Sequence, residues 1–253
     1  MDPIAFTIND ITVRWYGIMV ALAFVAGLLL LTFRARRFGL ERENAADLIL
    51  VAMIGGLVGA RALYVIKYWS AFSTSPWRII RIDQGGLVFY GGLIGGVLGV
   101  IIFCRIKNWG IPRIGDFAVP AVALGHAVGR IGCFLNGCCF GKPWDGPFSV
   151  QYSPGSHAAM VQSNKGLIPS AHMMPLEVFP VQLAATAANL AVCGALITLD
   201  RFMPKRGQIL AIYLILYGIA RFCLEFGRGD YLDPLKPFTS TQLLCIGVVL
   251  TGG

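Results

Sequence analysis

The sequence predicts an all-α membrane protein with seven transmembrane helices, and three observations support this class. The 253-residue chain is 56% hydrophobic and 13% charged, with a mean hydropathy of +0.69, which is too apolar for a water-facing globule of this size. Apolar stretches long enough to cross the hydrocarbon core, which takes about 20 helical residues, recur along the chain. Basic residues fall in short clusters between these stretches, where they set topology, so we expect no nucleic-acid partner.

Seven stretches qualify as candidate spans by length and hydrophobicity. They cover residues 15–33, 46–66, 87–105, 114–135, 176–199, 208–226 and 239–253. The fourth is rich in small residues and also contains polar ones, so it should be shielded by other helices. The seventh has an apolar part shorter than a full span and no flanking charge, which suggests a truncated last helix. We interpret residues 1–253 as a single integral membrane domain.

Basic residues are distributed unevenly between alternate loops. The short loops after the first, third and fifth spans are dense in arginine and lysine. The basic residues on the opposite side are spread over longer segments. Dense basic loops are cytoplasmic, so we expect the N-terminus outside. The longest loop, residues 136–175, then lies on the outer face as well. Its Phe148, Val150 and Tyr152 alternate as in a short strand, which predicts a small periplasmic cap between helices four and five.

Three arginines, Arg61, Arg130 and Arg221, lie inside predicted spans, each toward the outer side. A guanidinium in hydrocarbon is costly, so such residues are typical of functional sites. Glu225 stands four residues after Arg221, on the same helix face. Arginine binds a phosphate diester through paired hydrogen bonds, and a glutamate can accept a proton. The set therefore predicts a site for a phospholipid headgroup in the outer leaflet.

Each of these residues also has a structural alternative. An arginine near a helix end can snorkel to the headgroups, and Glu225 can simply neutralise Arg221. Tyr16 and Tyr90 open the first and third spans at the same outer level, where they either face the site or belong to an aromatic belt.

Glycines and cysteines indicate further features of the helices and of the site. Glycines four residues apart in the second, third and fourth spans indicate close helix packing, and we also assign Gly91 and Gly92 to the site. Cys133, Cys138 and Cys139 lie close together, but no histidine or carboxylate stands beside them at zinc-finger spacing, so we expect no metal site. A disulfide within this trio remains open.

The sequence segments around these residues resemble those of a known family. Gly129-Arg130-Ile131-Gly132-Cys133-Phe134-Leu135-Asn136-Gly137, continuing through Cys138, Cys139, Phe140 and Gly141, is similar to the signature of bacterial prolipoprotein diacylglyceryl transferases. Further agreement lies in Arg14-Trp15-Tyr16-Gly17, Gly59-Ala60-Arg61 and Arg221-Phe222-Cys223-Leu224-Glu225-Phe226. The likeness covers almost the whole chain in order.

The resemblance implies a multi-pass transferase of the bacterial inner (cytoplasmic) membrane, with its active site facing the outer leaflet. Its partners would be membrane lipids, phosphatidylglycerol as donor, and the signal peptide of a preprolipoprotein as acceptor. The diacylglyceryl group would pass to the lipobox cysteine thiol, forming a thioether and releasing glycerol phosphate. The resemblance implies no metal and no organic cofactor. An inactive lipid-binding homologue and a lipid or anion transporter are the alternatives.

The resemblance also assigns roles to individual residues. Arg130 would bind the lipid phosphate, and Arg221 and Glu225 would complete the catalytic centre. The remaining candidates for substrate binding are Tyr16, Arg61, Tyr90, Gly91, Gly92, Asn136 and Gly141. Tyr90 departs from the family pattern, in which many members carry a histidine at this place, and a phenol is a poor base at neutral pH.

Overall fold

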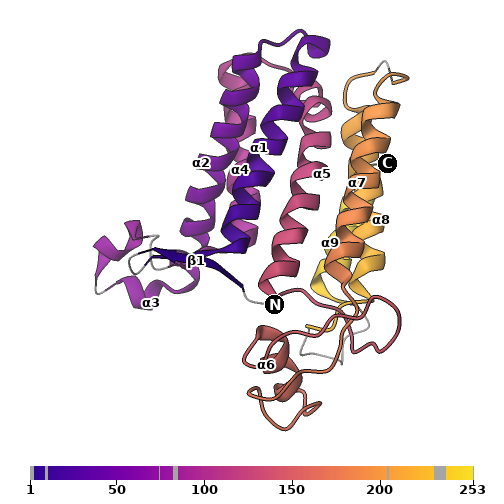
Figure 1. The fold of residues 1–253 in the computed structure, drawn as a ribbon. Helices are drawn as coiled ribbons and strands as arrows, with labels where there is room; N and C mark the ends of the chain where they lie inside the picture. The colour runs from indigo at the N-terminus through magenta and orange to yellow at the C-terminus, as the bar shows by residue number, and fades with distance from the viewer. Residues whose placement is uncertain are drawn as a thin grey trace. The chain divides into compact units, whose positions relative to one another are not determined.

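The computed structural model describes residues 3–8, 11–73, 75–81, 85–203, 205–230 and 238–252, and it is mostly helical (Figure 1). Within these described residues, six helices are long and apolar enough to cross a membrane. They are α1 (Trp15–Ala35), α2 (Arg42–Lys67), α4 (Phe89–Ile106), α5 (Ile111–Asn136), α7 (Val181–Leu199) and α8 (Gln208–Glu225). The shorter α9 (Ser240–Gly252) has 13 residues, fewer than a full span needs. The protein is therefore an all-α membrane protein.

Two of the predicted helix starts differ from the observed ones by four or more residues. Helix α2 begins at Arg42 rather than at residue 46, because Glu41 and Asn44 form a capping box that extends the helix into polar sequence. Helix α7 begins at Val181 rather than at residue 176, because Val178 hydrogen-bonds with Val150 instead. At the other end of the chain, Gly253 of the last predicted span lies outside the described residues.

The chain forms two compact units, one of which comprises Leu28–Phe117. This unit contains the end of α1, the short helices η1 (Arg36–Phe38), α3 (Trp69–Phe72) and η2 (Pro76–Ile80), helices α2 and α4, and the start of α5. Helices α2 and α4 lie side by side (Figure 1) and pack through glycines. A Cβ atom on Gly59 would lie 2.7 Å from the Cα atom of Gly95. Any larger side chain at Gly59 would therefore separate the two helices.

A buried arginine compensates for a proline inside α5. Pro120 has no N–H, so the carbonyl of Asp116, four residues earlier, loses its usual helical partner. Arg34 of α1 donates a hydrogen bond from Nη2 to this carbonyl oxygen at 3.1 Å, and both side chains are buried. The bond satisfies a backbone group that would be costly to leave unpaired.

The second unit comprises Met1–Gly27 and Ala118–Gly253. Within it, α7, α8 and α9 lie side by side (Figure 1). The chain enters α1 from an antiparallel hairpin of β1 (Ile4–Ile8) and β2 (Ile11–Arg14), which the sequence analysis did not anticipate.

A small folded subregion, called the cap below, follows α5. Its helix α6 (His157–Asn164) begins at a Ser156 cap, and its core contains Phe140, Tyr152, Ala158, Val161 and Val178. The strand expected at residues 148–152 is reduced to an isolated bridge between Val150 and Val178. Phe148 has a left-handed backbone (φ 65°) and is 86% exposed, so the extended segment cannot continue through it.

Candidate functional site

Arg61 of α2 is buried, and every N–H of its guanidinium is used by the backbone of its own unit. The group makes five hydrogen bonds to carbonyl oxygens at 2.7 to 3.0 Å. The acceptors belong to Arg78, Ile79, Arg81, Gly85 and Gly86. Since a guanidinium has five N–H donors, none remains for a ligand. The geometry favours the structural alternative for Arg61, which holds η2 and the segment after it against α2.

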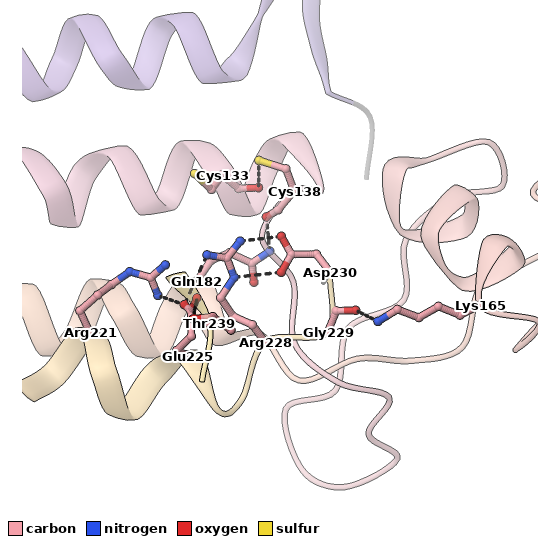
Figure 2. A network of polar contacts seen from close by, with 10 residues as sticks. All are labelled: Cys133, Cys138, Lys165, Gln182, Arg221, Glu225, Arg228, Gly229, Asp230 and Thr239. Atoms are coloured by element: carbon pink, nitrogen blue, oxygen red, sulfur yellow. Dashed lines mark hydrogen bonds and ion pairs between the residues drawn. The ribbon is translucent and has the colours of Figure 1, made fainter. Parts of the chain in front are cut away.

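Glu225, the last residue of α8, lies between two arginines (Figure 2). Its Oε2 atom is 2.5 Å from Nη1 of Arg221 and 3.6 Å from Nη1 of Arg228, and its side chain is fully buried. The hydroxyl of Thr239 donates to Oε1 at 2.9 Å. The predicted pairing of Arg221 with Glu225 is therefore present, and it belongs to a larger ion cluster.

Arg228 connects this cluster to a second carboxylate. Its Nε and Nη2 atoms donate to the two oxygens of Asp230 at 2.9 and 2.6 Å (Figure 2), the bidentate geometry that suits a guanidinium. Among the described residues, two cations and two carboxylates thus compensate one another at the end of α8. This arrangement fixes Arg221.

Arg130 of α5 differs from these arginines. Its side chain is partly buried, yet its guanidinium has no hydrogen-bond or ion-pair partner among the residues that the structure describes. His126 lies one helical turn earlier and within electrostatic range of both Arg130 and Arg221. Its ring contacts Tyr217 at a centroid distance of 5.2 Å. Because Glu225 compensates the charge of Arg221, the positive local field here comes from Arg130, and it suits an anionic ligand.

The start of α1 packs against the last turns of α5. A Cβ atom on Gly132 would lie 2.9 Å from Cβ of Met19 and 3.4 Å from Cδ2 of Tyr16, so the missing side chain lets the helices approach closely. Tyr16 is 44% exposed and lies within electrostatic range of Arg130 and Cys133. Tyr16 and Arg130 therefore lie near one another.

The turn after α5 is held by a side chain of α7. Gln182 of α7 donates from Nε2 to the carbonyl of Cys138 at 2.8 Å and to the hydroxyl of Tyr152 at 3.1 Å. Burial raises the pKa of Tyr152 to about 12, so this phenol stays protonated at neutral pH. Asn136, the last residue of α5, lies at the start of this turn.

Gly141 lies where three backbone segments meet. Its N–H donates to the carbonyl of Phe179 at 3.0 Å, and it forms an isolated bridge with Arg228. A Cβ atom here would overlap the Phe179 oxygen and lie 3.1 Å from that of Gly227. Lys165 of the cap also donates to the carbonyl of Gly229, at 2.6 Å (Figure 2). These contacts position the backbone that carries Arg228.

Tyr90, Gly91 and Gly92 open α4 in the Leu28–Phe117 unit. A Cβ atom on Gly91 would lie 2.6 Å from Cβ of Leu63 in α2, and one on Gly92 would lie 3.4 Å from the carbonyl oxygen of Gly56. The glycine pair therefore serves close packing against α2. Tyr90 is 47% exposed.

Sequence reasoning assigned no site role to several polar residues of the unit that comprises Met1–Gly27 and Ala118–Gly253. His126 precedes Arg130 by four residues on α5, so helical spacing was a usable signal for it. Arg228 follows Glu225 by three residues but lies beyond the end of α8. Gln182 and Thr239 contact their partners only in the folded chain, and no local sequence pattern predicts these contacts.

The fold and the site define a multi-pass α-helical membrane protein with a buried arginine-rich polar centre. The family model described as prolipoprotein diacylglyceryl transferase matches residues 3–253. Over 252 residues the chain is 31% identical to the phosphatidylglycerol–prolipoprotein diacylglyceryl transferase of Clostridium tetani, covering 100% of this chain and 95% of that relative. The enzymes of the same name from Bacillus licheniformis (32% over 250 residues; 99% and 89% covered) and Finegoldia magna (31% over 255 residues; 100% and 93%) are also similar. The chain belongs to the prolipoprotein diacylglyceryl transferase family, which confirms the resemblance seen in its sequence.

Arg61→Lys should destabilise the protein, because an ammonium has three N–H donors for five carbonyl acceptors. Each lost hydrogen bond to a charged donor costs about 1.5–3 kcal/mol, so we expect a clearly lower unfolding temperature in detergent, measured by circular dichroism. Arg130→Lys is the matched control, and it should unfold close to wild type. Equal unfolding temperatures for Arg61→Lys and wild type would show that the five bonds do not hold this unit together.

Proposed function

We propose that this chain transfers the diacylglyceryl group of phosphatidylglycerol to the lipobox cysteine thiol of a preprolipoprotein signal peptide, forming a thioether and releasing glycerol phosphate. The observation that carries the proposal is Arg130. It stands in the family signature, and its guanidinium is without a partner among the described residues. A cation so placed can receive the phosphate of the lipid.

The bond changes explain why an arginine is needed at this phosphate. The substrate thiol loses its proton to solvent, and its sulfur forms a bond to the terminal carbon of the diacylglyceryl group. The bond from that carbon to the phosphate oxygen breaks. The oxygen keeps the bonding electrons, so the phosphate gains a second negative charge as glycerol phosphate leaves. Hydrogen bonds from Arg130 strengthen as this charge develops, which lowers the barrier.

The surrounding residues take supporting roles in this mechanism. Glu225 compensates the charge of Arg221 and positions it near His126 and Arg130 through their ion pair. Tyr16, which packs at Gly132, shapes the space beside Arg130. The nucleophile is the thiol of the substrate and not a cysteine of this chain.

We further propose that the whole chain is one membrane domain of the bacterial inner membrane, with α9 contributing to a seventh crossing. Its N-terminus, its cap and the site around Arg130 would face the outer leaflet. The dense basic loops after the first, third and fifth spans support this orientation. It brings Arg130 to the leaflet where a secreted precursor presents its cysteine.

Arg130→Ala should abolish transfer while the protein stays folded. We expect the rate to fall at least about 100-fold, as when one donor to a developing oxyanion is removed. The assay incubates purified protein with phosphatidylglycerol and a lipobox peptide, and mass spectrometry detects the peptide carrying one diacylglyceryl group. Arg206→Ala, which changes an exposed loop residue, is the control. Near-normal turnover of Arg130→Ala would assign Arg130 a structural role, and no product from wild type would exclude the transferase reading.

Reporter fusions test the orientation. Alkaline phosphatase is active only outside the cytoplasm, so a fusion after Lys165 in the cap should be active, whereas one after Lys107 should be inactive. The reverse pattern in intact cells would place the cap and the proposed site on the cytoplasmic side.

A further inference from the structure

Three cysteines of the signature segment meet at the end of α5. The Sγ atoms of Cys133, Cys138 and Cys139 all lie within 4.8 Å of one another. All three thiols are free and partly buried. The sequence analysis noted that these cysteines are close together but expected no metal site, because no histidine or carboxylate stands beside them at zinc-finger spacing. One cysteine lies on α5 and the other two lie on the turn after it.

The backbone is bent to make this grouping. Gly137 (φ 69°) and Cys139 (φ 58°) both adopt the left-handed conformation, which folds the chain back over the last turn of α5. For a non-glycine residue such as Cys139 this conformation costs about 1–3 kcal/mol. The turn is pinned by the N–H of Cys138, which donates to the carbonyl of Cys133 at 3.1 Å, and by Gln182 (Figure 2). The fold therefore holds the three sulfurs together at some energetic cost.

Three sulfurs at this separation fit a soft metal ion. Zinc–thiolate bonds of about 2.3 Å place the sulfurs of a tetrahedral site about 3.8 Å apart, so each sulfur needs to move inward by less than about 1 Å. Thiolates select zinc and monovalent copper over the hard cations magnesium and calcium. We propose that Cys133, Cys138 and Cys139 form a three-thiolate site for a thiophilic d10 cation, Zn²⁺ or Cu⁺.

The surroundings balance the charge of such a site. Three thiolates with Zn²⁺ carry one net negative charge, and with Cu⁺ they carry two. Arg130 and Arg228 lie within electrostatic range of Cys139 and can offset this charge. Binding releases the thiol protons to solvent. Since the described residues add no histidine or carboxylate to the group, a tetrahedral zinc ion would keep one position for water.

Metal content is the direct test, and it does not depend on transferase activity. The full chain is purified in detergent with reductant and no chelator, dialysed against Zn²⁺ or, without oxygen, Cu⁺, and analysed by elemental mass spectrometry. We expect about one ion per chain. Cys133→Ser and Cys139→Ser should each weaken binding beyond the roughly 10- to 100-fold typical of residues that only orient a ligand. Cys223→Ser removes an exposed cysteine outside the cluster and should bind as wild type does.

Cobalt provides a readout in the unaltered protein in case the serine variants do not fold. Co²⁺ at a thiolate site produces sulfur-to-cobalt charge-transfer bands, which Zn²⁺ should remove by displacement. Competition against a Cu⁺ chelator shows whether the site prefers Cu⁺ or Zn²⁺. The proposal is overturned if neither ion binds while alkylation shows three free thiols, or if the purified chain carries a disulfide within the trio.

Discussion

The structure depends on one constraint: a guanidinium buried in an apolar chain has to be satisfied by nearby acceptors or anions. Arg34 is paired with a carbonyl freed by a proline, and Arg61 with five carbonyls of a folded-back segment. Arg221 is paired with Glu225. Each cation therefore organises the backbone or side chains around it. Arg130 is the exception among the arginines discussed, since its partner is not found among the described residues.

This contrast separates the arginines that build the protein from the one that can act on a substrate. The ion cluster at the end of α8 is internally compensated, so it can hold Arg221 near Arg130 without competing for a phosphate. Close backbone contacts at Gly141 and the cap lysine Lys165 position the segment that carries Arg228. The polar framework is thus fixed before any ligand arrives, which favours catalysis by preorganised charge.

The sequence was informative where a pattern is local. The length of the apolar stretches located all the long helices that the structure describes. Spacing by four residues predicted that Arg221 pairs with Glu225. It was less informative where tertiary contacts decide. The start of α7 moved because Val178 pairs with the cap, and Thr239 reaches Glu225 only when α9 packs on α8. The cysteine cluster depends on two left-handed residues whose conformation no spacing rule reveals.

The same limit applies to the role of Arg61. Its position in a predicted span suggested a ligand site, but the carbonyls that satisfy it come from a segment 17 to 25 residues further along the chain. Only the folded arrangement distinguishes an occupied guanidinium from an available one. That distinction is the basis for assigning phosphate binding to Arg130.

Lipid binding by Arg130→Gln tests this assignment most directly, because glutamine keeps a hydrogen-bonding side chain and removes the charge. Native mass spectrometry of the detergent-solubilised protein would compare phosphatidylglycerol with a diacylglycerol of the same acyl chains, which has no phosphate. Loss of a charged hydrogen bond worth about 1.5–3 kcal/mol predicts roughly 10- to 100-fold weaker binding of phosphatidylglycerol, with diacylglycerol binding little changed. Equal binding of phosphatidylglycerol by the variant and the wild type would contradict the account.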